Sequence, residues 1–528
     1  MKVLVADKLP ADAMGVLKGA GIEIVDRPGM TKEQLLDAVK DVEGIIVRSA
    51  TTITGEVLEK AERLKVVCRA GVGVDNVDVP AATKRGVIVM NTPAGNTLST
   101  AEHAFALILA MSRNIAPADK YMKEHKWEKK KFTGTQLAGK TLAVVGLGRI
   151  GREVAARAQA FKMKVIGYDP LIGKAQAQQI GVELFGTVDE LLPICDYMTV
   201  HVPLNEQTDG MIGREQFAKA KPGFRVVNCA RGGVIDEEAL LEALNKGQIA
   251  GAALDVYREE PPKDWRLPEH EKLVTTPHLG ASTVEAQEAV AQQAAEQMVE
   301  ALVNQRIINA VNLRAVAPEE MEVLEPYCVL ARRMGLLAAQ ILGEPVSSIE
   351  VTYEGEVSKR DFNLVSRHLV MGILSGAMEE ELNLVNVSVI ASERGIKMRE
   401  TVVDQPIDYA SMVLAKVTGA AKEVEISGAL ISKKEGRIVR LMGFEVEALP
   451  EGHLLVVEAS DRPGLIGKLG TVLGARGINI ARMTFGRKQS GGRALVVLNL
   501  DTAPSEDALK ELRNLADVDS VKHILIPK

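Results

Sequence analysis

Short apolar segments alternate with segments of helical periodicity through residues 1–97. Each apolar run has the length of a buried strand, and each stretch between two runs has the length of a helix that could cover it. The pattern predicts a parallel sheet with helices on its faces. The apolar runs are KVLVAD, IEIVDR, GIIVRS, LKVVCRAG and GVIVMN.

A second strand–helix series occupies the middle of the chain, from TLAVVGLGRIG to KLVTTPHLGAS. A long apolar helix precedes it, and Ser99 with Glu102 forms the S-x-x-E pattern of a capping box near its start. Another long helix follows, and Ser282 with Glu285 repeats this pattern. The series predicts a second α/β unit bounded by two long helices.

The regular alternation of strands and helices does not continue in the remainder of the chain. In residues 314–449, helical runs are followed by β-like segments such as EVEISGALIS. Residues 453–528 then follow the order β-α-β-β-α-β. The chain is long enough for several domains with separate cores. We expect four units, of which the first two form one enzyme core.

Composition excludes several classes of protein. The net charge of −6 at pH 7 gives no reason to expect a nucleic-acid partner. No apolar stretch approaches the roughly 20 residues of a membrane span, and the charged start MKVLVADKLP is unlike a signal peptide. The four cysteines form no CxxC pair, so we expect neither a disulfide framework nor a metal site. These features indicate a cytoplasmic protein without a membrane partner.

Residues 134–141, GTQLAGKT, match the phosphate-loop pattern G-x-x-x-x-G-K-[ST] by their letters alone. That loop binds phosphate only where a strand precedes it and a helix follows. Here a charged stretch precedes the motif and the strand TLAVV follows it, so the order is inverted. We therefore reject this motif as a nucleotide site.

The motif GLGRIG has the surroundings that a dinucleotide-binding turn requires, with a strand before it and a helix after it. Gly146 permits the tight turn, Gly148 lets the backbone approach a pyrophosphate, and Gly151 lets the helix pack close to the sheet. The next strand ends in Asp169, whose carboxylate suits the ribose hydroxyls of NAD and disfavours the extra phosphate of NADP. The motif predicts a Rossmann-type, doubly wound parallel sheet that binds NAD.

Polar residues follow several later strands of this series, at the edge where open parallel sheets bind ligands. His201 also ends a strand, but it lies among apolar neighbours and has no evident carboxylate partner. Each residue could be structural on its own, and their convergence on one edge favours a site. The residues are Arg231, Asp255, Glu260 and His278.

These residue types suit the oxidation of an alcohol beside a carboxylate. Histidine titrates near neutral pH and can accept the hydroxyl proton. A neighbouring glutamate favours the protonated ring and orients it. Arginine can hold a carboxylate through two charge-assisted hydrogen bonds. We therefore expect Arg231 to bind a substrate.

The combination GLGRIG…YDP…NCARGG…LDVYREEPP…PHLGAS resembles the D-isomer-specific 2-hydroxyacid dehydrogenases, over essentially the whole chain. The resemblance implies that Arg231, Glu260 and His278 form the catalytic set. Glu260 is preferred to Glu259 because the glutamate of the family directly precedes the proline. Tyr257 stands where many members have phenylalanine, a change that we expect to matter little.

The resemblance also implies the ligand contacts, with NAD as the cofactor. For Arg48 a surface loop position is the alternative. The residues implied for NAD are Gly146, Gly148, Arg149, Ile150, Gly151, Asp169, Val202, Cys229, Ala230, Asp255 and Gly280. The residues implied for the substrate are Arg48, Gly71, Val72, Gly73 and Asn96.

In this family the cofactor domain is inserted into a discontinuous, flavodoxin-like substrate domain. The resemblance thus implies a substrate domain at residues 1–97, completed by a helix and linker at 283–313. An NAD-binding domain lies between them at 98–282. Residues 314–449 resemble the α+β intervening domain of long-chain members.

Residues 453–528 resemble a βαββαβ ACT domain, a small amino-acid-sensing fold. The expected effector contacts are Asp461, Gly464 and Asn479. Gly464 lets the chain pass close to a ligand, and the start of the next helix favours a carboxylate. A purely structural or dimerising domain is the alternative.

Members of this family that carry both an intervening and an ACT domain oxidise D-3-phosphoglycerate to 3-phosphohydroxypyruvate, the first committed step of L-serine biosynthesis. The resemblance therefore implies this reaction, with L-serine as a candidate feedback effector. One alternative is a glyoxylate or hydroxypyruvate reductase on the same core, and another is a non-catalytic NAD-sensing protein. The sensor-like C-terminal unit favours the biosynthetic enzyme, and the intact Arg–Glu–His set disfavours the sensor. We expect a homo-oligomer, either a dimer or a tetramer.

Overall fold

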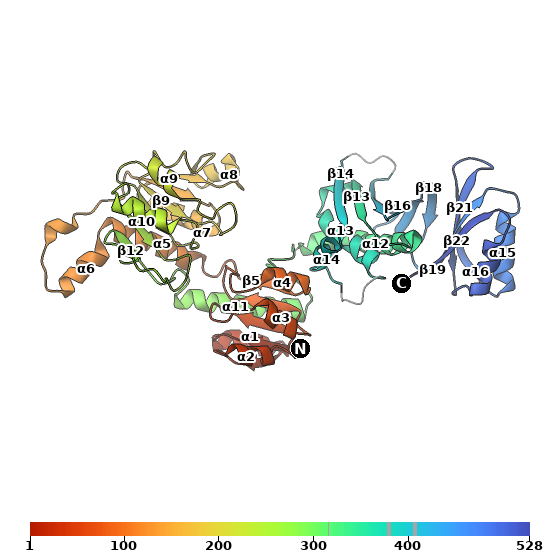
Figure 1. The fold of residues 1–528 in the computed structure, drawn as a ribbon, viewed down its shortest axis with the longest axis horizontal. Coiled ribbons are helices and arrows are strands. Elements are labelled where there is room, and N and C mark those ends of the chain that lie inside the picture. Colours follow the sequence, from red (N-terminus) through yellow and green to blue (C-terminus); the bar gives the residue numbers. More distant parts are fainter. Residues whose placement is uncertain (315, 377–381, 405–408, 528) are drawn as a thin grey trace.

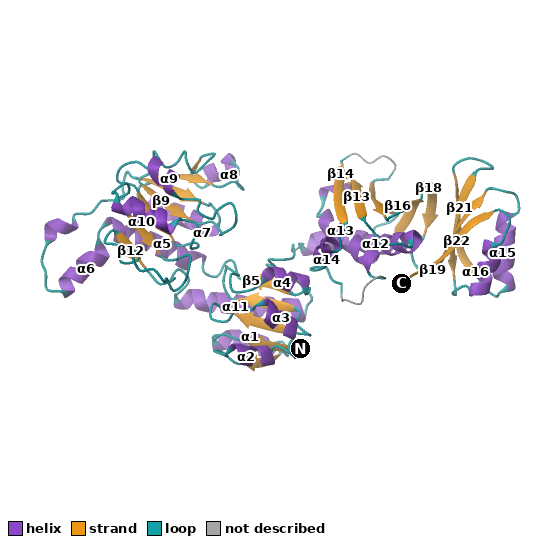
Figure 2. Ribbon diagram, viewed as in Figure 1, coloured by secondary structure: helices purple, strands orange, loops and turns teal. Residues whose placement is uncertain are grey.

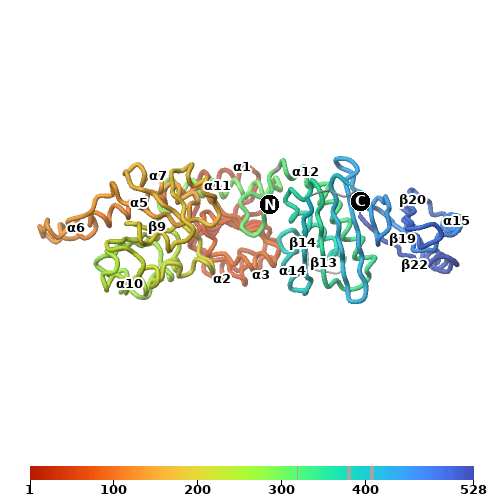
Figure 3. Tube along the Cα trace, turned by 90° about the horizontal axis from the view of Figure 1, so that it is seen from above, coloured from red at the N-terminus to blue at the C-terminus, as the bar shows by residue number. Residues whose placement is uncertain are grey.

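The computed structural model describes residues 1–314, 316–376, 382–404 and 409–527. The chain is elongated (Figure 1), and the view from above agrees (Figure 3). Two parallel sheets occupy one end of the molecule, and a mixed and an antiparallel sheet occupy the other. The predicted α/β fold class is confirmed.

The first sheet has five parallel strands in the order β2-β1-β3-β4-β5. Separate apolar clusters lie on its two faces, because helices cover both (Figure 2). The strands are β1 (Lys2–Val5), β2 (Glu23–Asp26), β3 (Gly44–Val47), β4 (Val66–Arg69) and β5 (Ile88–Asn91). The helices are α1 (Ala11–Gly19), α2 (Lys32–Ala38), α3 (Gly55–Lys60), α4 (Val79–Lys84) and, from far along the chain, α11 (Val284–Leu302), which packs on α1, β3 and β4.

The second sheet has seven parallel strands in the doubly wound order β12-β11-β10-β9-β6-β7-β8. Apolar clusters again lie on both faces. The strands are β6 (Thr141–Val145), β7 (Lys164–Tyr168), β8 (Glu183–Leu184), β9 (Tyr197–Val200), β10 (Arg225–Asn228), β11 (Gly251–Leu254) and β12 (Leu273–Thr275). The helices are α5 (Thr97–Ser112), α6 (Ile115–Lys123), η1 (Lys129–Phe132), α7 (Arg149–Ala160), α8 (Lys174–Gln179), α9 (Arg214–Lys219) and α10 (Glu237–Asn245).

The two long helices that join these domains do not start as the sequence predicts. Helix α5 begins at Thr97, so Ser99 lies inside its first turn, and the Ser99 hydroxyl donates to the Gly280 carbonyl at 2.7 Å. Helix α11 is capped by Thr283, whose side chain accepts from the Ala286 N–H at 3.1 Å. The S-x-x-E patterns therefore mark the right helices, but their serines are not the caps.

The C-terminal part holds two further sheets. The mixed sheet has the order β14-β13-β15-β16-β17-β18, and the antiparallel sheet has the order β20-β21-β19-β22. The first is built from α12 (Pro318–Leu342), β13 (Ser348–Gly355), η2 (Glu356–Lys359), α13 (Phe362–Leu374), α14 (Val387–Glu393), β14 (Lys397–Val403), β15 (Ser411–Thr418), β16 (Glu423–Leu430), β17 (Gly436–Leu441) and β18 (Phe444–Ala448). The second is built from β19 (Gly452–Ser460), α15 (Leu465–Ala475), β20 (Ile480–Arg487), β21 (Arg493–Leu500), α16 (Glu506–Arg513) and β22 (Val518–Ile526).

These two C-terminal units share one hydrophobic core. One face of the antiparallel sheet packs on its own helices α15 and α16, while Leu454, Val456 and Ile524 from the other face join the core of the preceding unit. Gln340 on α12 donates from Nε2 to the Leu525 carbonyl at 3.1 Å and accepts from the Leu525 N–H at 3.2 Å. The two units are therefore held together as one body.

The preceding unit also contacts the first domain, at the amino ends of strands β4 and β5. Lys84 Nζ lies 2.8 Å from Glu393 Oε1, and the Asn383 side chain donates to the Gly86 carbonyl at 2.9 Å. The carboxyl ends of these strands, at Arg69 and Asn91, lie at the other edge of the sheet. The C-terminal body and the candidate site thus lie at opposite edges of one sheet.

The helices, the possible metal ligands and the cysteines of the described residues also bear on function. Among the described helices, none has both the length and the apolar character required to cross a membrane. In the same residues no group of three or more His, Cys, Asp or Glu side chains is placed to hold a metal ion. All four cysteines are buried free thiols.

Candidate active site

The carboxyl ends of the two parallel sheets meet at the junction of the first two domains. Arg231 follows β10 on one side, Asp75 follows β4 on the other, and Arg231 Nε donates to Asp75 Oδ2 at 3.1 Å. A Cβ atom at Gly73 would overlap the guanidinium of Arg231, so the Arg231 side chain lies directly against this glycine. The Arg231 side chain stays 28% exposed and is accessible to a ligand.

His278 and Glu260 form a close pair beside this junction. His278 Nδ1 lies 2.6 Å from Glu260 Oε2, whereas Glu259 forms its ion pair with Lys263. The hydrogen bond to Glu260 raises the pKa of His278 above its ordinary value, against the opposing effect of burial. Burial raises the pKa of Glu260, but the bonds from His278 and the Tyr257 N–H outweigh it and leave this pKa lowered. The imidazole is thus oriented and made more basic.

Arg48 and Arg69 extend the positive charge on the first domain. Arg48 follows β3, and its backbone N–H donates to Asp7 Oδ2 at 2.6 Å. Arg69 ends β4, and its buried Nε has no hydrogen-bond partner among the residues that the structure describes. Burial first, and then repulsion from Arg231 and, more weakly, Arg48, lower the pKa of Arg69. Three guanidinium groups therefore lie near one another, an arrangement that favours binding of an anion.

The sequence reasoning missed Arg69 and Asp75. A signal was available for Arg69, because a cation directly before the glycines of RAGVG ends a strand in the same way as Arg231 before its two glycines. Asp75 carried no such signal, since it reads as an ordinary loop carboxylate. Its contact with Arg231 depends on how the two domains face each other.

The other residues implied for the substrate lie at the same junction, and they differ in whether their polar atoms are already hydrogen-bonded. The carbonyl of Gly71 accepts from the Thr92 N–H at 2.9 Å, and the carbonyl of Val72 accepts from Asn91 Nδ2 at 2.5 Å. These two carbonyls are therefore already engaged. Asn96, at the start of α5, has a buried Oδ1 that no group in the described part of the chain bonds to, and this free acceptor suits a ligand group.

The GLGRIG turn has the geometry that a dinucleotide needs. Gly146 has φ of +90°, and a Cβ atom at Gly151 would overlap the Gly146 carbonyl. Around Gly148 a Cβ atom would meet nothing within 4 Å, so the backbone is open to a pyrophosphate there. Asp169 directly follows β7, beside the turn, and its Oδ2 accepts from the Leu147 N–H at 2.8 Å. These residues fit NAD.

The remaining residues implied for NAD line the same edge of the second sheet. Arg149 and Ile150 begin α7, Val202 follows β9, and Cys229 with Ala230 follows β10. Burial raises the pKa of the Cys229 thiol well above its ordinary value, which keeps it in the thiol form.

His201 lies at this edge too, but it has no carboxylate partner in the described part of the chain. Its Nε2 lies 3.0 Å from Thr199 Oγ1, and burial lowers its pKa to about 4. An imidazole with so low a pKa is a weak base at physiological pH and holds a transferred proton poorly. His278 is the better candidate for that role.

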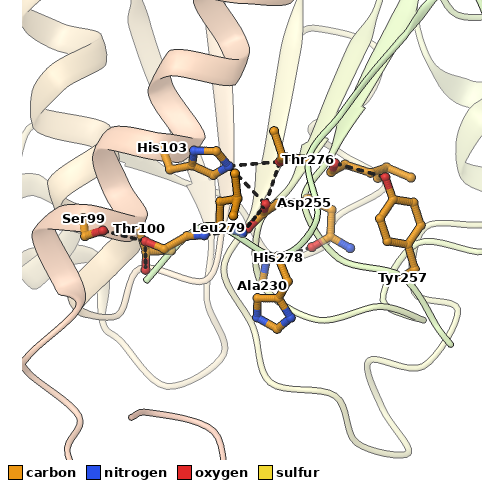
Figure 4. A network of polar contacts seen from close by, with 12 residues as sticks. Ser99, Thr100, His103, Ala230, Asp255, Tyr257, Thr276, His278 and Leu279 are labelled. Carbon is orange, nitrogen blue, oxygen red and sulfur yellow. Dashed lines mark hydrogen bonds and ion pairs between the residues drawn. The ribbon is translucent and has the colours of Figure 1, made fainter. Parts of the chain in front are cut away.

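Asp255 follows β11, as the sequence predicts, and both Asp255 and Gly280 make hydrogen bonds that hold the loop of His278. Asp255 is fully buried beneath the loop that carries His278 (Figure 4). Its carboxylate accepts from the Thr276 hydroxyl at 2.6 Å, the Leu279 N–H at 2.7 Å and the Gly280 N–H at 2.8 Å. Both residues are thus engaged in holding this loop.

The residues implied for an effector all lie on the last domain, with Asp461 and Gly464 before helix α15 and Asn479 beyond its other end. Asp461 and Asn479 already have partners within this domain. Asp461 Oδ2 accepts from Arg487 Nη1 at 2.9 Å and from the Gly491 N–H at 3.1 Å. Asn479 donates to Asp501 Oδ2 at 2.7 Å. Gly464 has φ of +90° at the N-cap of α15. An effector would have to exchange some of these contacts.

Three family models match successive parts of the chain. Residues 105–280 match the D-isomer specific 2-hydroxyacid dehydrogenase, NAD binding domain. Residues 323–442 match the D-3-phosphoglycerate dehydrogenase intervening domain, and residues 453–517 match the ACT domain.

Proteins of similar sequence match this chain over most of its length. The D-3-phosphoglycerate dehydrogenase of Methanocaldococcus jannaschii is 44% identical, over 98% of this chain and 99% of its own. That of Bacillus subtilis is 42% identical over the full length of both chains. The solved D-lactate dehydrogenase of Aquifex aeolicus, complexed with NAD and lactic acid, is 27% identical and matches with a TM-score of 0.51 over 58% of this chain and 96% of its own. With its full-length likeness to the first two proteins, this chain belongs to the D-3-phosphoglycerate dehydrogenases, within the D-isomer-specific 2-hydroxyacid dehydrogenase family.

Proposed function

We propose that this protein oxidises D-3-phosphoglycerate to 3-phosphohydroxypyruvate with NAD, the entry step of L-serine biosynthesis. The observation that carries the proposal is the group of three arginines, Arg48, Arg69 and Arg231, beside the His278–Glu260 pair. A substrate with a carboxylate at one end and a phosphate at the other has two anionic groups for these cations. Glyoxylate has one, so the arginines favour the phosphorylated substrate over the alternative reductase.

Arg231 binds the substrate carboxylate in this proposal. Its present partner is the carboxylate of Asp75, 3.1 Å from Nε, which marks where a carboxylate is accepted. Asp75 is 71% exposed and can turn away at little cost, because exposed ion pairs contribute little. Arg48 and Arg69 then bind the phosphate, for which the planar guanidinium is well suited.

His278 accepts the proton of the substrate hydroxyl at Nε2, since Nδ1 is held by Glu260. Glu260 favours the imidazolium that forms and keeps the ring from turning. NAD, held by the turn at Gly146, Gly148 and Gly151 and by Asp169, supplies the hydride acceptor when it is bound. Oxidation of the alcohol therefore leaves its proton on His278.

We further propose that the arm formed by α6 and η1 joins two copies of this chain in a homo-oligomer. The arm projects from the NAD-binding domain (Figure 1), and it exposes Ile115, Met122 and, at 80%, Trp127. Apolar side chains grouped on a projecting segment indicate a protein interface. Sedimentation velocity would contradict this by finding a monomer at micromolar concentration.

Arg69→Ala tests the phosphate assignment. The variant should raise KM for D-3-phosphoglycerate by roughly 10-fold or more, since a charge-assisted contact is worth about 1.5–3 kcal/mol. The rate with D-glycerate, which lacks the phosphate, should change little. Arg63→Ala, at the opposite edge of the same sheet, is the control. NAD reduction by the unmodified protein comes first, and its failure with D-3-phosphoglycerate would reject the proposed function.

Glu260→Gln should lower the pKa of His278, because the carboxylate that raises it is removed. A base acts unprotonated, so the rise of kcat/KM with pH should move to lower pH, and kcat should fall. NMR titration of the His278 imidazole measures the same pKa directly, with His278→Gln to assign the resonance. A pKa that stays the same in Glu260→Gln would contradict the pairing.

We also propose that L-serine binds the last domain at Asp461, Gly464 and Asn479. Isothermal titration calorimetry should then show saturable heat with L-serine, and Asn479→Ala should weaken it. The exposed Asn514→Ala, on the same domain, should behave like the unmodified protein. Absence of heat with the active protein would leave this domain a structural role.

A further inference from the structure

The loop of residues 276–280, which carries His278, is fastened to helix α5 rather than to its own neighbours alone. His278 has φ of +55°, a left-handed backbone that non-glycine residues seldom adopt. Such a conformation persists only where the surroundings hold it. The contacts that hold this loop therefore decide where the imidazole lies.

Both sides of the loop are held by hydrogen bonds (Figure 4). On one side the Asp255 carboxylate accepts from Thr276, Leu279 and Gly280, and the Asp255 carbonyl accepts the His278 N–H at 2.9 Å. On the other side, the Ser99 and Thr100 hydroxyls of α5 donate to the Gly280 carbonyl. The peptide groups next to His278 thus have little freedom.

Helix α5 presents a polar face to this loop. Ser99 and Thr100 donate to the Gly280 carbonyl at 2.7 and 3.2 Å. One turn further, His103 Nε2 lies 3.1 Å from Asp255 Oδ1 and 3.1 Å from Thr276 Oγ1. Residues three and four apart share one helix face, so the three side chains act together.

The hydrogen-bond partners of His103 determine which of its ring nitrogens carries a proton. The carboxylate of Asp255 only accepts, so His103 must carry a proton on Nε2 to bond with it. Burial raises the pKa of Asp255, but the bonds from His103 and Thr276 outweigh this and leave the pKa lowered. With its side chain 1% exposed, Asp255 is a buried charge that needs every one of these donors.

We infer that His103 is a positioning residue for the proposed reaction: through Asp255 it fixes the loop that places the His278 imidazole. The inference rests on the proposed function and deepens it, because it gives α5 a part in catalysis. Helix α5 is also the segment that leaves the substrate domain, where Asn96 precedes it. The substrate side and the base are thereby connected through one rigid helix.

Two variants separate the hydrogen bond from the mere presence of a side chain. His103→Leu fills the space without a donor, while His103→Gln keeps an amide donor at similar reach and carries no charge. His103→Leu should lower kcat by roughly 10- to 100-fold, as a small displacement of a reacting group does. Its dissociation constant for NAD should rise by a smaller factor than kcat falls, since His103 itself is not among the residues implied for NAD. His103→Gln should recover most of kcat.

Amide hydrogen exchange on the ligand-free protein provides a readout without activity. The peptide that spans residues 276–280 should exchange faster in His103→Leu than in His103→Gln or the unmodified protein. Glu102→Gln, on the solvent side of the same helix, is the matched control and should change neither exchange nor kcat. If His103→Leu does not fold, Thr276→Val removes another donor to Asp255 and should show the same loosening.

Three results would overturn the inference: unchanged kcat and exchange in His103→Leu, equal damage in His103→Gln, or a loss explained by weaker NAD binding. An unmodified protein that is inactive on D-3-phosphoglycerate would reject the proposed function instead. The exchange result would still decide whether His103 holds the loop.

Discussion

Parallel strands end at a common edge, and this constraint brings the candidate site together. The first domain delivers Arg48 and Arg69 at the ends of β3 and β4, and the second delivers Arg231 after β10. The chain passes between the two domains at the starts of α5 and α11; α5 then packs on the second sheet and α11 on the first. Charges of one sign are then close enough for Arg231 to lower the pKa of Arg69. An anionic substrate is the natural partner for that arrangement.

The sequence predicted those features that local backbone requirements dictate. The glycines of GLGRIG and Asp169 follow from the turn between a strand and a helix, so their positions were readable without the fold. The fold class followed in the same way from the alternation of apolar runs. Contacts between distant segments were not readable. The ion pair of Asp461 with Arg487 and the use of Ser99 against Gly280 both depend on tertiary packing.

Asp255 shows how one position carries several roles that only geometry separates. By sequence it is a polar residue at a strand end, like Arg231, and was assigned to the cofactor. In the structure its carboxylate is enclosed and bonded to the loop, and His103 completes its shell. His103 escaped notice because it lies within an apolar helix. The spacing of Ser99, Thr100 and His103 on one helix face was the signal.

The C-terminal domains share a core and touch the substrate domain at the amino ends of its strands, opposite the arginines. Any effector signal must therefore pass through that sheet or through partner subunits. We expect the junction of the first two domains to bind one substrate through both its carboxylate and its phosphate. A crystal structure with NAD and D-3-phosphoglycerate tests this expectation most directly. We predict the carboxylate on Arg231, the phosphate beside Arg48 and Arg69, and the hydroxyl at His278 Nε2; a substrate bound elsewhere, with Arg231 still paired to Asp75, would contradict it.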